Sequence, residues 1–107
     1  MISPKVFASV PFNSYNALTD MAGTMELYVR GLVEQAGLAV PLLPIGSVGG
    51  QEWLDAIQQQ MNHLGAALGL AVTDVASYDL RDASDFASWT FSVSNLLESF
   101  RLAAGVA

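Results

Sequence analysis

The sequence contains no cysteine, which excludes disulfide bonds, thiolate nucleophiles and cysteine-ligated zinc. It also contains a single histidine, His63, so no second imidazole exists to share a metal ion. A zinc or di-iron site in a helical protein needs such ligands or a cluster of glutamates. We therefore expect no metal and no cofactor, and we expect His63 to be solvated or to lie at an interface.

Charged residues are also scarce. They form 13% of the chain, where an ordinary soluble domain has about 25%. Only Lys5, Arg30, Arg81 and Arg101 are basic, and they are scattered along a chain whose formal net charge is −6. Binding to a phosphate backbone requires clustered lysine and arginine. The composition therefore predicts no nucleic-acid partner.

The chain has no long hydrophobic run. Its longest unbroken apolar stretches, residues 38–46 and 64–72, are about half of the ~20 residues that a membrane-spanning helix needs. Pro4 and Pro11 interrupt the N-terminal segment, which lacks the continuous apolar region of a signal peptide. We expect no direct membrane insertion and no Sec signal peptide.

The stretch from Gly46 to Gly50 matches no ligand-binding loop. It lacks the lysine of a phosphate-binding loop, the Gly-x-Gly-x-x-Gly spacing of a dinucleotide site and the Gly-x-Ser-x-Gly spacing of a nucleophile elbow. Prolines precede it, and Gln51 and Glu52 follow it, as is typical of a joint between two helices. Because no catalytic motif appears elsewhere either, we predict that the protein is not an enzyme.

What the chain does have is hydrophobic residues, 52% of 107 positions, which is enough for one domain with a single core. Apolar residues recur every three or four positions in three segments, which predicts helices over about residues 14–36, 51–76 and 84–104. The glutamines at positions 58–60 are expected on the polar side of the second helix. With an extended arm over residues 1–12, the predicted fold is an all-α, antiparallel three-helix bundle.

The ends of the predicted helices carry capping residues. Asn13 or Ser14 is expected to cap the start of the first helix, and Asp82 or Ser84 the start of the third. A glycine follows both helices, Gly37 after the first and Gly105 after the third.

One segment of the third helix has a competing pattern. Residues 89–94 alternate apolar and polar side chains and are rich in β-favouring types, so an α+β fold with a short strand there is the alternative. We favour the helix because the apolar stripe from Phe86 to Ala103 would otherwise break without a glycine or proline.

The segment over residues 74–85 is acidic. Asp74, Asp79, Asp82 and Asp85 surround Arg81, and carboxylates so close together could coordinate calcium. The order of ligands in an EF-hand, with its central glycine and final glutamate, is missing. We expect a solvated loop, and the sequence leaves ion binding open.

Several apolar side chains lie off the three main stripes, and a single three-helix core does not easily bury all of them. The spacing of Gly65 and Gly69 further indicates a face of the second helix where another backbone approaches closely. We therefore predict a contact surface with a second copy or a larger assembly, formed by Leu27, Val29, Val33, Trp53, Gly65, Gly69, Leu70, Phe91 and Leu102.

One family resemblance starts from the glycines before Trp53 and from the spacing Tyr78-x-x-x-Asp82. Together they are similar to the helical-hairpin substrates of type VII secretion, which carry a Trp-x-Gly turn and a Tyr-x-x-x-Asp/Glu export signal. The resemblance implies an exported adaptor with its signal at Tyr78 and Asp82. This chain departs from the pattern, because Leu54 and Asp55 follow the tryptophan and a third helix is present.

These observations favour a protein that works by contact. We expect a non-catalytic structural or assembly subunit that makes helix-mediated contacts with other proteins, for example in a virion or a secretion particle. The exported adaptor is the alternative.

Overall fold

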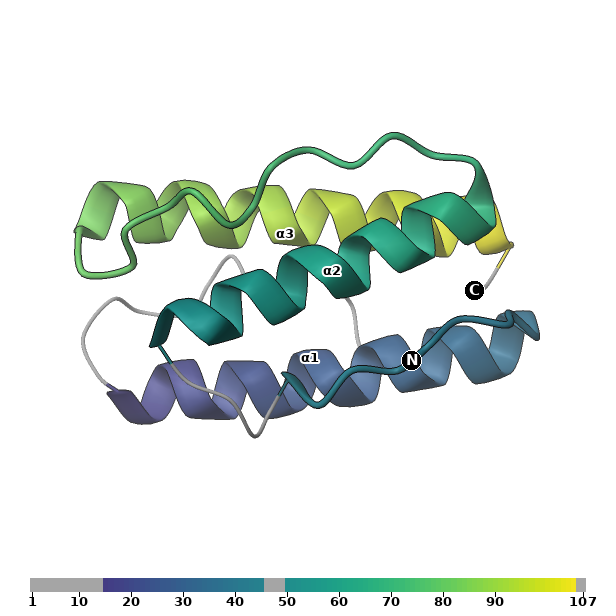
Figure 1. Ribbon diagram of the computed structural model, residues 1–107, viewed down its shortest axis with the longest axis horizontal. Coiled ribbons are helices and arrows are strands. Elements are labelled where there is room, and N and C mark those ends of the chain that lie inside the picture. Colours follow the sequence, from purple (N-terminus) through teal and green to yellow (C-terminus); the bar gives the residue numbers. More distant parts are fainter. Residues whose placement is uncertain (1–14, 46–49, 106–107) are drawn as a thin grey trace.

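The computed structural model describes residues 15–45 and 50–105, and this part of the chain is a three-helix bundle without strands. Helix α1 spans Tyr15–Ala36, α2 spans Gly50–Leu68 and α3 spans Ala83–Ala104 (Figure 1). The all-α prediction is confirmed, and the alternative strand over residues 89–94 is wrong because α3 continues through that segment. The predicted arm over residues 1–12, the cap at Asn13 or Ser14 and most of the glycine joint lie outside the described residues.

All three helices run in the same direction, so the expected antiparallel arrangement is wrong. Each helix begins at the left end of the bundle in Figure 1 and ends at the right. The aromatic contacts agree with this, because Trp53 in the first turn of α2 lies 5.0 Å, between ring centroids, from Trp89 near the start of α3. The expectation followed the usual topology of helical bundles, in which consecutive helices are antiparallel neighbours. Instead, long connectors carry the chain back along the bundle before α2 and α3 begin.

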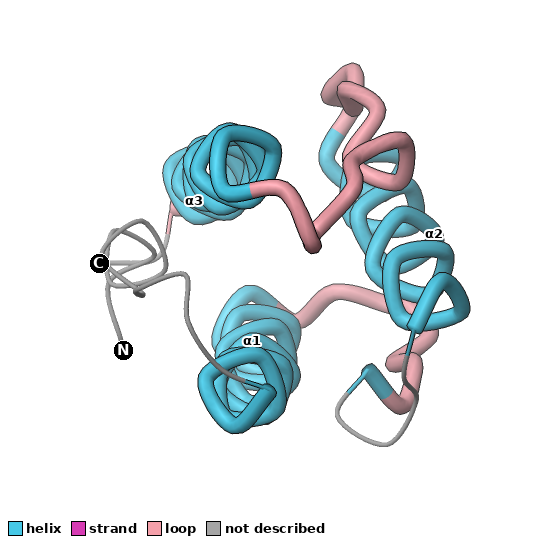
Figure 2. Tube along the Cα trace, turned by 90° about the vertical axis from the view of Figure 1, so that its left-hand side faces the viewer, coloured by secondary structure: helices cyan, strands magenta, loops and turns pink. Residues whose placement is uncertain are grey.

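The connectors can do this because they are extended. An extended chain advances about 3.3 Å per residue, whereas a helix advances only about 1.5 Å. A connector therefore needs about half as many residues as the helix to cover the same length. Seen along the bundle, the three helices occupy the corners of a triangle and the connectors lie between them (Figure 2). Each connector also contributes one fully buried aliphatic side chain to the core, Ile45 from the first and Val75 from the second.

The first connector is held by Gln60 of α2, which is fully buried. Its side-chain amide donates to the carbonyl oxygen of Pro41 at 3.0 Å and accepts from the N–H of Leu43 at 2.8 Å. The expectation that this glutamine faces solvent is therefore wrong. A connector without a neighbouring strand needs partners for its backbone groups, and the amide of Gln60 supplies one donor and one acceptor.

The second connector is held in the same way by Gln58. Its side chain accepts from the N–H of Val75 at 2.6 Å and donates to the carbonyl oxygen of Thr73 at 3.3 Å. Both glutamines thus bind the C=O of one residue and the N–H of the residue two positions later. In a β-sheet, a strand pairs with the backbone C=O and N–H groups of its neighbouring strand in a similar way. Two side chains of one helix therefore anchor both returning segments.

Helix α2 ends at Leu68, well before the expected end at residue 76. Gly69 has a left-handed backbone with φ of 70°, and the N–H of Leu70 bonds the carbonyl oxygen of Gly65 at 2.9 Å. This hydrogen bond closes the helix as a Schellman cap. The apolar period continues to Val75 in the sequence because Val75 does reach the core, but from the connector rather than from the helix.

The described caps of the other two helices are as predicted. The side chain of Asp82 accepts from the N–H of Asp85 at 2.9 Å and begins α3. Gly37 follows α1 with φ of 65°, and Gly105 follows α3 with φ of 71°. All three helices therefore end in a left-handed glycine at the same end of the bundle.

Candidate protein-contact surface

Three residues of the predicted contact surface belong to the core of the chain itself. Val29, Val33 and Trp53 are each less than a tenth exposed. Their assignment to an interface is wrong because it assumed one narrow stripe per helix. Helix α3 packs against both other helices, and the connectors fill the space between them, so each helix buries a wider arc than a single stripe.

The two glycines of the Gly-x-x-x-Gly spacing have local roles. A Cβ atom on Gly65 would lie 2.3 Å from Cγ2 of Val72 and 2.8 Å from the carbonyl oxygen of Leu70. The close backbone approach at Gly65 is therefore between α2 and the segment that follows it, where the chain turns back. Gly69 provides the left-handed turn itself.

The other predicted contact residues are exposed, but they lie on different parts of the molecule. Leu27 is on α1, and Leu70 is at the start of the second connector; Leu42 of the first connector is also exposed, although the sequence did not indicate it. Phe91 and Leu102 both lie on α3 and are 62% and 65% exposed. Their separation is close to three helical turns, so they lie on the same side of α3, about 16 Å apart.

The most exposed positions of α3 carry no charged side chain. We call the side that they form the outer face of α3. It consists of Ala83, Ser84, Ala87, Ser88, Phe91, Asn95, Ser99, Leu102 and Ala103. The exposed positions described on α1 include Arg30 and Glu34, and those on α2 include Asp55. The outer face of α3 therefore combines two large apolar side chains with small or neutral neighbours, as the centre of a protein interface does.

One ionised residue of α3 lies on the same side as these positions, because Glu98 follows Phe91 by seven residues and precedes Leu102 by four. Glu98 and Arg101 form an ion pair at 2.5 Å, and both side chains are partly exposed. The hydrogen bond from Arg101 to Glu98 raises the pKa of the arginine, so its guanidinium group stays ionised. The outer face of α3 thus has neutral side chains at its most exposed positions and one partly exposed carboxylate between them, that of Glu98, which is paired with Arg101.

Tyr28 of α1 lies close to this ion pair and gives a test of the packing. Burial raises the pKa of Tyr28 to about 12, against a smaller lowering by Arg101. An unfolded tyrosine titrates near 10. We therefore expect a stability contribution that is fully present below about pH 10 and is lost as the pH rises from about 10 to about 12.

The free energy of unfolding, measured by urea titration at several alkaline pH values, checks this expectation. Tyr28→Phe should show a smaller loss over the same pH range, because the buried group can no longer ionise. Ultraviolet titration of the wild type should show a late ionisation that is missing from Tyr28→Phe. Identical ultraviolet titration curves above pH 10 for the folded wild type and for Tyr28→Phe would contradict the burial of Tyr28.

The residues of the type VII resemblance have other contacts in the structure. Trp53 lies inside α2 and packs on Trp89 rather than occupying a turn, and α1 and α2 do not form a hairpin. Asp82 caps α3, and the hydroxyl of Tyr78 lies 3.2 Å from Oγ of Ser92. These contacts explain the positions of both residues within the fold, and the export signal remains a prediction.

The acidic segment over residues 74–85 is held by its own hydrogen bonds. Ser77 and the N–H of Ala76 bond to Asp74, and both interactions lower the pKa of that carboxyl. Arg81 bonds to Asp79 at 2.9 Å and lowers the pKa of Asp79. Within residues 15–45 and 50–105, no three histidine, cysteine, aspartate or glutamate side chains gather as metal ligands.

His63 is exposed on α2.

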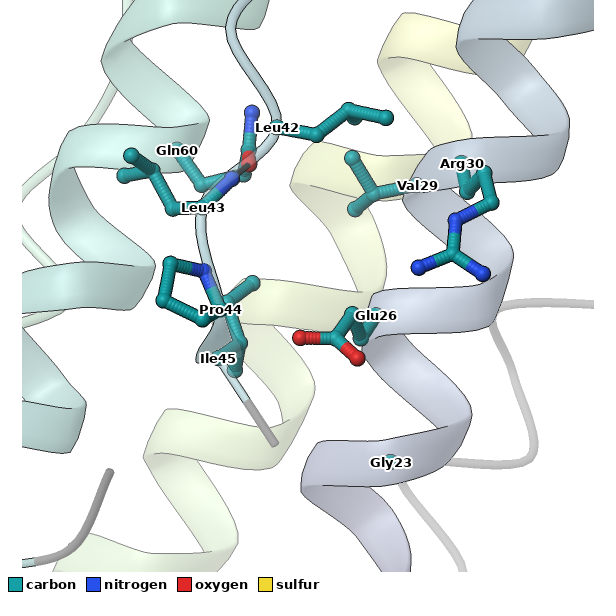
Figure 3. A pocket seen from close by; sticks show the side chains of 9 residues that line it. All are labelled: Gly23, Glu26, Val29, Arg30, Leu42, Leu43, Pro44, Ile45 and Gln60. Carbon is teal, nitrogen blue, oxygen red and sulfur yellow. Dashed lines mark hydrogen bonds between the residues drawn. The ribbon is translucent and has the colours of Figure 1, made fainter. Parts of the chain in front are cut away.

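A hollow of about 550 Å³ lies between α1 and the first connector. Figure 3 shows its lining residues, which are Gly23, Glu26, Val29, Arg30, Leu42, Leu43, Pro44, Ile45 and Gln60. Most of the lining is apolar, and Glu26 and Arg30 add one charge of each sign. These nine residues include one carboxylate, that of Glu26, and no histidine, cysteine or lysine.

Comparisons with protein-family models, with characterised proteins and with solved structures found no match to this chain. Of the helices that the structure describes, none has the length and apolar character needed to cross a membrane.

Proposed function

We propose that this protein is a non-catalytic assembly subunit and that the outer face of α3 is its contact surface. The observation that carries the proposal is the exposure of Phe91 and Leu102 on one side of α3, whose most exposed positions carry no charged side chain. Particles such as a virion or a secretion apparatus are assemblies of this kind.

The energetics of this face support contact. Full burial of a phenylalanine or leucine side chain contributes about 1.5–3 kcal/mol, and both residues still expose more than half of their surface. Covering charged groups would cost hydration energy that often cancels such a gain. The outer face of α3 limits this cost, because its most exposed side chains are neutral and the partly exposed carboxylate of Glu98 is paired with Arg101.

Light scattering of the purified chain tests the proposal. We expect a mass above that of the 11.3 kDa monomer, increasing with concentration. Phe91→Lys should reduce the mass to that of the monomer, because it places a charge in the centre of the contact. Leu27→Lys is the matched control, since Leu27 is similarly exposed on a different helix and its replacement should leave the mass unchanged. A wild-type chain that stays monomeric at every concentration would refute self-assembly.

A further inference from the structure

We infer that the hollow between α1 and the first connector is a binding site for a free amino acid with a large apolar side chain. This inference goes beyond the proposed assembly function and does not depend on it, because the residues that line the hollow belong to other elements than α3. It rests on the apolar lining, on a guanidinium group that has no ionic partner among the described residues, and on the carboxylate that lies one helical turn away.

The hollow has the size and the lining of a small-molecule site. Its volume of about 550 Å³ falls within the roughly 300–1,000 Å³ of ligand pockets. Val29 of α1 and Ile45 of the connector are buried, whereas Leu42 is 46% exposed. An apolar group that fills the hollow would cover Leu42 and remove its surface from water. We therefore expect a ligand with a large apolar side chain.

Arg30 is the cation that can bind a ligand in this hollow. The other two arginines that the structure describes are paired with Asp79 and Glu98. Arg30 is exposed and forms no ion pair with any described residue. Its guanidinium group extends from α1 into the space that faces the first connector (Figure 3). Because a guanidinium group can bind a carboxylate with two parallel hydrogen bonds, Arg30 is suited to the carboxylate of a ligand.

Glu26 brings the opposite charge to the same hollow. It precedes Arg30 by one helical turn, so the Cβ atoms of the two residues lie about 5–6 Å apart on one side of α1. Figure 3 shows both charged groups directed toward the connector. The ammonium and carboxylate groups of an amino acid are bonded to the same carbon atom, so two neighbouring side chains can bind both. Glu26 then accepts from the ammonium group, and Arg30 donates to the carboxylate group.

The charges of the chain favour a zwitterion over an ion. An aliphatic acid would bring its carboxylate close to Glu26 in a protein whose net charge is −6, and an aliphatic amine would bring its ammonium group close to Arg30. A longer peptide carries its ammonium and carboxylate groups at opposite ends. The amide of Gln60 already bonds the first connector, so the two charged residues determine the polar recognition.

Titration of the full chain with L-leucine, followed by nuclear magnetic resonance, tests this site. The N–H of Leu43 and the side-chain amide of Gln60 report binding, because both residues line the hollow. We expect their signals to shift and saturate, whereas the signal of Gly105 at the end of α3 stays unchanged. Ligands of this size bind weakly, so the titration should extend to about 10 mM. The absence of any shift at Leu43 and Gln60 in the folded protein would overturn the inference.

Ligand analogues separate the three contacts without changing the protein. Isocaproate lacks the ammonium group of leucine, isoamylamine lacks its carboxylate group, and glycine lacks its apolar side chain. Each analogue is expected to bind at least about tenfold more weakly than leucine, because one contact is lost. Binding of any of the three as tightly as leucine would contradict the recognition of an apolar zwitterion.

Two pairs of variants test the charged residues. Arg30→Gln should weaken leucine binding at least about tenfold, whereas Arg81→Gln removes the same charge outside the hollow and should leave the affinity unchanged. Glu26→Gln and Glu34→Gln form the second pair, and the loss is expected only for Glu26→Gln. Circular dichroism checks that each variant is folded. Equal affinities of the wild type and Arg30→Gln would show that the ligand does not bind through Arg30 and would overturn the site.

Discussion

Replacement of Gln60 by methionine is expected to lower the free energy of unfolding by about 2–4 kcal/mol, because two backbone groups of the first connector lose their partner at a buried position. Methionine has a similar shape but neither donates to the carbonyl of Pro41 nor accepts well from the N–H of Leu43. The loss follows from unsatisfied polar groups rather than from a cavity. Urea denaturation followed by circular dichroism measures it.

Gln59→Met is the control for this experiment. Gln59 is the neighbouring residue of the same helix and is exposed, so its replacement should change the free energy of unfolding by less than about 0.5 kcal/mol. Equal effects of the two substitutions would show that Gln60 does not hold the connector.

Gly65→Ala is expected to destabilise the fold by about 1–3 kcal/mol, although alanine is the better helix former. The new methyl group would lie 2.3 Å from Cγ2 of Val72 and 2.8 Å from the carbonyl oxygen of Leu70. The carbonyl oxygen belongs to the backbone, so relief requires the returning connector to move away from α2. Thermal and urea denaturation of the variant measure the loss.

Gly23→Ala is the same substitution at a helical position where, among the described residues, no atom outside the surrounding helical turns lies within 4 Å of the added Cβ. We expect it to stabilise the protein by about 0.5–1 kcal/mol, because only the helix-propensity effect remains. We therefore expect Gly65→Ala to lower the free energy of unfolding and Gly23→Ala to raise it. A stabilising effect of Gly65→Ala would contradict the tight return of the chain at Leu70–Val72.

The two glutamines explain how a chain of this length maintains parallel helices. A long connector exposes many backbone groups that need hydrogen-bond partners, and a small bundle has no sheet to provide them. Gln58 and Gln60 each provide a donor and an acceptor from α2. Stability of the connectors and stability of α2 should therefore be coupled.

The candidate site was only partly predictable. Phe91 and Leu102 were identified because they lie off the apolar stripe of the third helix, and the structure places both on its exposed side. The same reasoning failed for Val29, Val33 and Trp53, because a stripe does not show how many neighbours a helix has. Leu42 was missed because the prolines beside it indicated only a joint.

The sequence by itself determined the three helices and the described caps at Gly37, Asp82 and Gly105, since these depend on side-chain spacing and local backbone geometry. It did not determine the early end of α2, since Gly69 breaks the helix while the apolar period continues past it. Only the tertiary structure decided the shared direction of the helices and the burial of Gln60. Both depend on contacts between segments far apart in the chain, where a returning connector needs the hydrogen bonds that α2 supplies.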